Sequence, residues 1–200
     1  MSSSIIKYVV IGCSAGSSNV LESIVINLPQ DFSIPIIIVR HISPERQSLS
    51  YAELLSQKFD KKVEEPMDKS KIEKGTIYVA PPGYHLLVEK EGYFSLSLED
   101  KVLYCRPSID LLFESAAHAF GPNLSGIILS GANSDGSLGL SKIKEFGGVT
   151  IAQNPDSALF PLMPKSAIQF GIIDYIMNVD EIFNYLKKIN KDVLNENSIG

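Results

Sequence analysis

The chain has 200 residues, of which 44% are hydrophobic and 20% charged, and its formal net charge at pH 7 is −5. This length and composition are typical of one globular domain, and the acidic balance argues against a surface built mainly to bind nucleic acid or anionic lipid. No apolar run approaches the ~20 residues of a membrane-spanning helix, and the first residues lack the pattern of a secretory signal. We therefore expect a cytoplasmic protein that neither inserts into a membrane nor binds nucleic acid.

Apolar runs alternate with helical patterns along the chain, which predicts strand-helix-strand units around a largely parallel sheet. The predicted strands are residues 5–11, 34–39, 76–80, 127–129, 149–152 and 172–177, and residues 85–89 and 94–98 form a β-hairpin. The predicted helices are residues 20–28, 51–59, 109–120, 137–146 and a last helix that begins at Asp180.

These elements predict an α/β fold: a three-layer α/β/α domain with a mostly parallel, mixed central sheet and one β-hairpin. No linker rich in Pro, Gly and Ser and no internal repeat divides the chain. We expect a single domain over residues 1–190, followed by a frayed carboxyl-terminal tail over residues 191–200.

Polar residues follow three of the predicted strands. Ser14 lies after the first strand, His41 after the second, and Asp135 in the loop after the strand that ends at Leu129. Because parallel strands end at one edge of a sheet, these loops are expected to meet there. Serine, imidazole and carboxylate are the groups of an acyl hydrolase, in which the imidazole takes the proton of the hydroxyl and the carboxylate orients the imidazole.

Ser14 stands in a G-x-S-x-G turn, Gly12 to Gly16, between a strand and a helix. Glycines on both sides leave the hydroxyl accessible, and the backbone N–H of Ala15 is placed to stabilise an oxyanion. Such a turn more often binds a phosphate or merely reverses the chain. Likewise His41 alone could cap a strand end and Asp135 alone could belong to a turn, so only their coincidence with Ser14 favours catalysis.

The remaining candidates are read as secondary or structural. Cys13 and Cys105 are too few for a disulfide framework, and Cys13 is expected to point into the sheet. His85 is interpreted as structural and His118 as solvated, so no metal site is predicted.

Arg106 and Asp110 flank the start of a predicted helix. Both could contact a substrate, although Asp110 in a first turn is explained by the helix dipole alone.

Several collinear motifs resemble the catalytic domain of the bacterial chemotaxis protein-glutamate methylesterases, the CheB-type family. They span nearly the whole chain and are VVIGCSAG (9–16), VRHI (39–42), GTIYVAPPGYHLL (75–87), RPSIDLLFESAA (106–117), GIILSG (126–131), SDG (134–136) and MPKSAI (163–168).

The resemblance implies a cofactor-independent serine hydrolase that cleaves glutamate γ-methyl esters on the cytoplasmic helices of chemoreceptors, releases methanol and, in some members, deamidates glutamine. It assigns Ser14 as nucleophile, His41 as base and Asp135 as orienting carboxylate, which agrees with the assignment from the strand ends. Methylated chemoreceptor helices would be the partner, with a separate regulatory protein as a further candidate. Family members commonly carry an amino-terminal receiver domain, and only about four residues precede the first strand here. We therefore expect no receiver domain.

The chain departs from the family pattern at three points. Ala15 stands where the family usually carries Thr and Ala132-Asn133 where it has Met-Gly, both beside the expected site, and Cys105 replaces the His that usually precedes Arg-Pro-Ser. Ala in place of Met would enlarge the pocket beside the carboxylate. Two alternatives therefore stay open: a Ser-His-Asp esterase or amidase with another substrate, and a non-catalytic module of the same fold that binds an anion or a protein.

Overall fold

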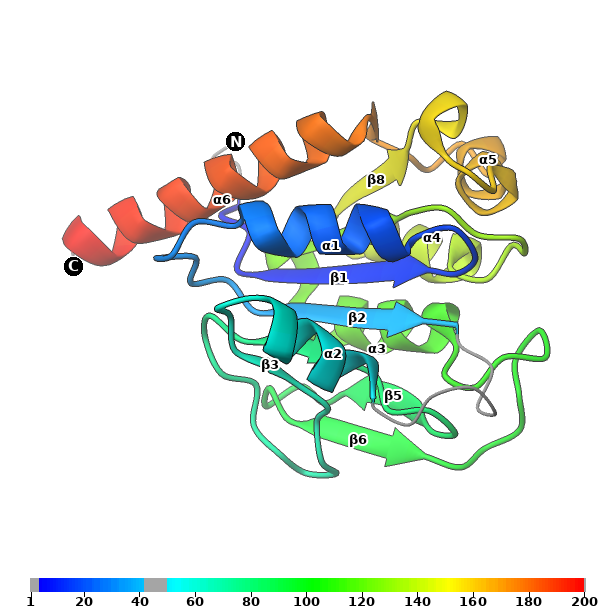
Figure 1. Cartoon of the computed structure of the whole chain (residues 1–200), viewed down its shortest axis with the longest axis horizontal. Coiled ribbons are helices and arrows are strands. Elements are labelled where there is room, and N and C mark those ends of the chain that lie inside the picture. The colour runs from blue at the N-terminus through cyan, green and yellow to red at the C-terminus, as the bar shows by residue number, and fades with distance from the viewer. Residues whose placement is uncertain (1–3, 42–49, 200) are drawn as a thin grey trace.

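The fold is a three-layer α/β/α domain, seen in a computed structural model that describes residues 4–41 and 50–199. Its central sheet has seven strands in the order β3-β4-β2-β1-β7-β8-β9, and every neighbouring pair is parallel. The antiparallel strand pair of the described residues is a separate hairpin of β5 and β6. The predicted architecture is confirmed, with the antiparallel part lying outside the central sheet (Figure 1).

The predicted helices and strands occur in the predicted order along the chain. The strands of the sheet are β1 (Tyr8–Cys13), β2 (Ile36–Arg40), β3 (Val63–Glu64), β4 (Ile77–Val79), β7 (Leu124–Ile128), β8 (Val149–Gln153) and β9 (Tyr175–Met177), and the hairpin is β5 (His85–Val88) and β6 (Phe94–Ser97). The helices are α1 (Ser18–Asn27), α2 (Tyr51–Lys58), α3 (Ile109–Phe120), α4 (Ser137–Glu145), α5 (Leu162–Gln169) and α6 (Val179–Ile199).

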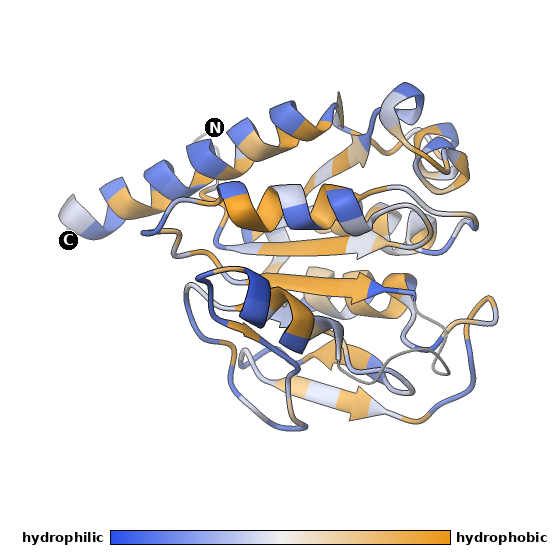
Figure 2. Cartoon of the chain, viewed as in Figure 1, coloured by the Kyte–Doolittle hydropathy of each residue, from blue (hydrophilic) through white to orange (hydrophobic). Residues whose placement is uncertain are grey.

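Two apolar layers cover the two faces of the sheet. One face packs against α1, α2 and α6, and the other against α3, α4, α5 and the hairpin. Successive side chains of β1 pack into opposite layers: Val9 and Ile11 belong to the first and Val10 to the second. Strands buried on both sides read as continuous hydrophobic runs, as β1 and β2 do in Figure 2.

Several elements differ from the sequence prediction, among them β3, which was not predicted. The tail predicted to fray beyond Lys191 is helical, because α6 continues to Ile199, and its buried residues include Val193. Helix α5 was not predicted. It contains Pro164, but this residue lies within the first turn, a position where proline is tolerated. The last strand begins at Tyr175 rather than at residue 172. Within residues 4–41 and 50–199, no helix is both long and apolar enough to cross a bilayer.

Candidate functional site

The three predicted loops meet at the carboxyl ends of β2, β1 and β7, which are neighbours in the sheet. The backbone N–H of His41 donates to the Cys13 carbonyl at 3.0 Å, which fixes the start of the β2 loop beside the β1 loop. The N–H of Ser14 donates to the Ser130 carbonyl at 2.9 Å, which ties the β1 loop to the β7 loop. Backbone pairing alone therefore brings residues 14, 41 and 130 to one edge of the sheet.

Asp135 is fully buried at the amino terminus of α3. Its Oδ2 accepts the N–H of Ile109 at 2.8 Å, and its Oδ1 accepts the N–H of Asp110 at 2.9 Å and the hydroxyl of Ser108 at 3.1 Å. The free N–H groups and the positive end of a helix dipole favour an anion at this point. The first turn of α3 thus fixes the carboxylate in one orientation.

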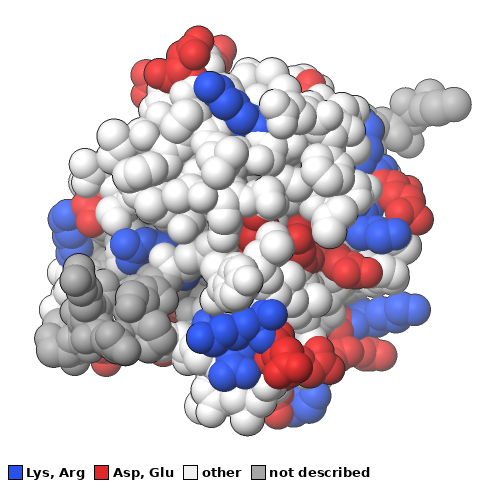
Figure 3. Space-filling model, turned by 90° about the vertical axis from the view of Figure 1, so that its right-hand side faces the viewer, with Lys and Arg blue, Asp and Glu red and all other residues white. Residues whose placement is uncertain are grey.

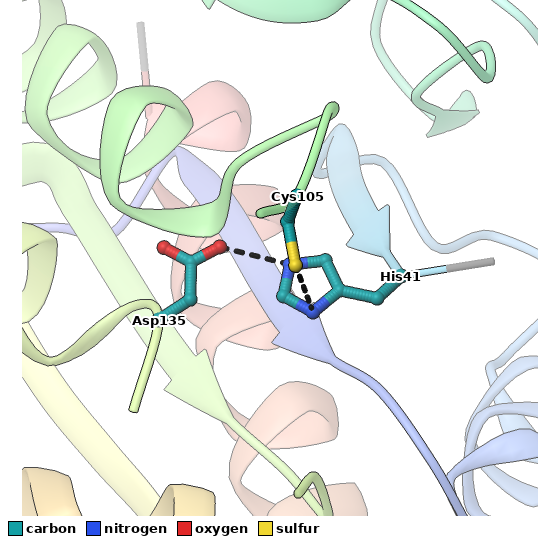
Figure 4. Close-up of side chains that lie close together, drawn as sticks. All are labelled: His41, Cys105 and Asp135. Carbon is teal, nitrogen blue, oxygen red and sulfur yellow. Dashed lines mark hydrogen bonds and ion pairs between the residues drawn. The ribbon is translucent and has the colours of Figure 1, made fainter. Parts of the chain in front are cut away.

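His41 lies between Asp135 and Cys105 (Figure 4). Its Nε2 is 2.8 Å from Asp135 Oδ2, and its Nδ1 is 3.5 Å from Cys105 Sγ. An ionised carboxylate only accepts hydrogen bonds, so Nε2 carries the proton and Nδ1 holds the free lone pair of the neutral ring. The atom of His41 that can act as a base is therefore Nδ1.

The surroundings shift the pKa values of both groups. Burial opposes protonation of His41, but the hydrogen bonds with Asp135 and Cys105 outweigh it and raise the imidazole pKa to about 9. Burial also opposes ionisation of Asp135, yet the hydrogen bonds from His41 and from the N–H groups of Ile109 and Asp110 lower its pKa. The pair is thus an ionised carboxylate beside an imidazole that binds a proton more tightly than usual.

Ser14 is half-buried, and the turn after it is tightly folded. The carbonyl of Ser14 accepts the hydroxyl of Ser17 at 2.6 Å, and Gly16 has a φ of +74°. Among the described residues, none accepts the N–H of Ala15, and no hydrogen bond joins Ser14 Oγ to His41. The hydroxyl and an unpaired backbone donor therefore stand together at the start of the turn.

The predicted pocket residues divide into two groups. Asn133 bridges the site, because its Oδ1 accepts the N–H of Asp135 at 3.3 Å and its Nδ2 lies 3.5 Å from Cys105 Sγ. Ala132 is exposed beside it. Arg106 instead donates from one Nη1 to the carbonyls of Leu98 and Glu99, at 2.9 and 3.0 Å. Its guanidinium thus ties the loop after β6 to the start of α3.

Two residues outside the predicted triad, His85 and Asp110, support Asp135. His85 is fully buried, accepts the N–H of Ser108 at 3.1 Å and contacts the Asp100 carbonyl through Nε2 at 3.0 Å. Asp110 Oδ1 accepts the N–H groups of Gly136 and Gly139, at 2.9 and 2.7 Å. The structural interpretation of His85 is confirmed, and Asp110 turns inward to hold the loop that carries Asp135.

The two cysteines have different surroundings. Cys13 is fully buried, as expected, and burial dominates the shift that raises its pKa to about 11, so its thiol stays protonated. Cys105 is half-buried and borders His41, which the sequence alone did not predict. The one available sign was its place next to the Arg106-Pro107-Ser108 segment, which leads into the helix that binds Asp135.

His41, Cys105 and Asp135 place candidate metal ligands within 4.8 Å of one another. However, Asp135 and Cys105 contact opposite nitrogens of the same ring, so each ring nitrogen already has a hydrogen-bond partner. The arrangement suits proton transfer along a thiol, imidazole and carboxylate series better than metal binding.

Comparisons with known proteins show the family of the chain. The model of the CheB methylesterase family matches residues 9–186. A relative from Leptospira interrogans is 43% identical over 188 residues, which cover 94% of this chain and 97% of the relative. A Clostridium acetobutylicum relative, named protein-glutamate methylesterase/protein-glutamine glutaminase, is 33% identical, and the match covers 94% of this chain and 54% of the relative.

A solved structure shares the fold. The Thermotoga maritima CheB methylesterase catalytic domain matches with a TM-score of 0.84 and 32% identity, over 93% of this chain and 98% of that domain.

Proposed function

The chain belongs to the CheB methylesterase family, and from this premise we propose that it is a serine hydrolase that cleaves glutamate γ-methyl esters on chemoreceptors in chemotaxis adaptation. The observation that carries the proposal is the hydrogen bond between His41 Nε2 and the buried carboxylate of Asp135, beside the accessible turn of Ser14. This arrangement supplies a base whose tautomer is fixed. The reaction is proposed to take place in the cytoplasm, where the receptor helices that bear such esters lie.

We propose the following roles for the three residues. His41 Nδ1 takes the hydroxyl proton of Ser14 while Oγ attacks the γ-carbonyl carbon, which forms a C–O bond and a tetrahedral oxyanion. The imidazolium returns the proton to the leaving methoxide, so that methanol departs and an acyl-serine remains. Water, activated by the same nitrogen, then releases the glutamate carboxylate and restores Ser14. Asp135 stabilises the imidazolium throughout.

The free N–H of Ala15 is our proposed donor to the oxyanion, since no described residue accepts it. In this structure Nδ1 faces Cys105 rather than Ser14, so the first step requires Ser14 Oγ to approach Nδ1 when substrate binds. Catalytic hydrogen bonds are often looser before substrate arrives. No metal or organic cofactor takes part in the proposed steps.

A protein substrate fits the surface around the turn. A Cβ built on Gly16 would lie 2.8 Å from both Leu159 and Phe160, so these two side chains border the turn, and both are exposed, as is Leu162. Figure 3 shows the face at the strand ends, much of which is uncharged, with the Lys, Arg, Asp and Glu side chains gathered in separate groups. An apolar rim beside the nucleophile suits an amphipathic receptor helix.

The test is the release of methanol from methylated receptor by the wild type and by Ser14→Ala. We expect turnover to fall at least 10³-fold in Ser14→Ala while circular dichroism and thermal unfolding are preserved. The control is Ser56→Ala, which removes an exposed hydroxyl from α2 and should leave turnover unchanged. Persistent turnover in Ser14→Ala would refute the proposed nucleophile.

Activity of the wild type on small esters but not on receptor glutamates would instead support an esterase with another substrate. Inertness toward a serine-directed organophosphate, together with tight phosphate binding, would support the non-catalytic module.

Glutamine deamidation is a second proposed activity of the same residues, because Clostridium and other relatives bear the name protein-glutamine glutaminase. The chemistry differs only in the leaving group, ammonia in place of methanol. Mass spectrometry of a receptor helix before and after incubation would detect the gain of about 1 Da per converted glutamine, which Ser14→Ala should abolish.

A further inference from the structure

We propose that Cys105 is a second nucleophile of this site, activated by His41, and that its reaction with soft carbon electrophiles switches the esterase off. The inference concerns a residue with no part in the proposed ester hydrolysis. It rests on the series formed by the Cys105 thiol, the His41 imidazole and the Asp135 carboxylate.

Cys105 and Asp135 contact the two ring nitrogens of His41. Cys105 Sγ lies 3.5 Å from Nδ1, which is within the range of a hydrogen bond to sulfur, and Asp135 holds the other nitrogen at 2.8 Å. A thiol next to an imidazole that a carboxylate orients is the arrangement that activates cysteine nucleophiles. In the neutral ring Nδ1 is the free base, and in this structure the group it faces is the thiol.

The surroundings of Cys105 Sγ also favour a nucleophile. The Asn133 side-chain amide nitrogen lies 3.5 Å from Sγ, so its N–H can stabilise negative charge that develops there. Cys105 is half-buried, and its neighbour Tyr104 is 95% exposed, so a small reagent can reach the loop. Cys13 lacks this access, because it is fully buried, and burial raises its pKa to about 11, so that its thiol stays protonated.

Alkylation of Cys105 would block the esterase reaction. When sulfur attacks a haloacetamide, a C–S bond forms, the carbon–halogen bond breaks, halide departs and the thiol proton passes to Nδ1 and then to water. The group left on sulfur occupies the space beside Nδ1, the atom that must accept the proton of Ser14. Modified protein would therefore lose esterase activity without losing its fold.

The experiment uses iodoacetamide on the folded protein, with adducts counted and located by mass spectrometry. We expect one adduct, at Cys105, and a loss of methanol release that parallels labelling. In His41→Gln the labelling rate should fall at least tenfold, since general-base assistance of this kind is worth about 10²-fold or more. Equal rates in the wild type and His41→Gln would overturn the proposal, as would full esterase activity in stoichiometrically labelled protein.

Two further variants separate this proposal from the proposed esterase mechanism. Ser14→Ala should still label at Cys105 with the wild-type rate, because the readout is adduct mass and not turnover. In Cys105→Ser, the rate of methanol release should be the same before and after treatment with iodoacetamide. If Ser14→Ala retained turnover while labelling still depended on His41, the esterase assignment would fail and the Cys105 proposal would stand.

Discussion

Asp135 and His41 are separated by 94 positions in the sequence, yet Oδ2 of the carboxylate lies 2.8 Å from Nε2 of the ring. The same oxygen accepts the backbone N–H of Ile109, also at 2.8 Å. One helix terminus thus fixes the carboxylate, and the carboxylate fixes the ring.

The pH dependence of the esterase follows from the raised pKa of His41, about 9. Only the neutral ring can take a proton, so kcat/KM should rise about tenfold per pH unit between pH 7 and 8 and level off above about 9. The stability that His41 contributes runs the other way, being fully present below its unfolded pKa and lost as pH rises through about 9. A rate profile that is already flat at pH 7 would contradict this prediction.

The cap residue Ser108 tests whether the start of α3 positions Asp135. Its hydroxyl donates to Asp135 Oδ1 at 3.1 Å, and its oxygen accepts the N–H of Leu111 at 3.5 Å. We expect Ser108→Ala to cost about 1–2 kcal/mol of unfolding free energy and to lower kcat several-fold. Urea denaturation and steady-state kinetics measure the two effects.

Its matched control is Ser50→Ala, which removes the capping hydroxyl of α2, an acceptor for the N–H of Glu53 at 3.1 Å. The stability cost should be similar, with kcat unchanged. If both variants kept wild-type kcat, Ser108 would be a cap and nothing more.

Asp110 carries a buried charge close to Asp135. Burial and the neighbouring carboxylate raise its pKa, so its ionised form opposes folding near neutral pH. Asp110→Asn keeps an oxygen for the N–H groups of Gly136 and Gly139, and we expect equal or greater stability, by up to about 1 kcal/mol. Asp110→Ala leaves both donors unpaired and should cost about 2–3 kcal/mol. Thermal unfolding at pH 7 would refute this view if the two variants were equally destabilised.

Gly16 and Gly92 have nearly the same φ angle in different surroundings. Their φ angles are +74° and +76°, but a Cβ at Gly16 would lie 2.8 Å from Leu159 and Phe160, whereas at Gly92 it would meet nothing within 4 Å. Gly92→Ala should therefore cost only the backbone strain, about 1 kcal/mol. Gly16→Ala should cost more and should also reduce kcat, by moving the turn that holds Ser14. Unfolding and kinetic measurements on the pair isolate the effect of crowding.

Much of the site could be predicted because it depends on local sequence patterns that all indicate the same parallel sheet. Continuous apolar runs gave β1, β2 and β7, and parallel strands end at one edge, so Ser14, His41 and Asp135 were expected together. The structure places His41 and Asp135 in contact, while the catalytic roles of all three residues stay predictions.

What the sequence could not predict depends on contacts between distant segments. Cys105 reaches His41 only because the loop before α3 folds over the strand ends, and no periodicity reports such a placement. Asp110 at a helix start has a sufficient local explanation in the helix dipole, which concealed its bonds to Gly136 and Gly139. Helix α5 was missed because proline, here Pro164, normally signals a break in a helix. The length of α6 was missed because its last residues are mostly polar, and their sequence does not indicate that Val193 is buried.

The order of the strands has a consequence for synthesis on the ribosome. Strand β1 lies between β2 and β7, and Val9 pairs with Ile36 on one side and with Ser125 on the other. The second of these neighbours emerges only after more than half of the chain has been made, and the carboxylate at position 135 follows it. A nascent chain therefore cannot join the carboxylate of Asp135 to the imidazole of His41 before that point, and a chain that stops upstream of it lacks this carboxylate.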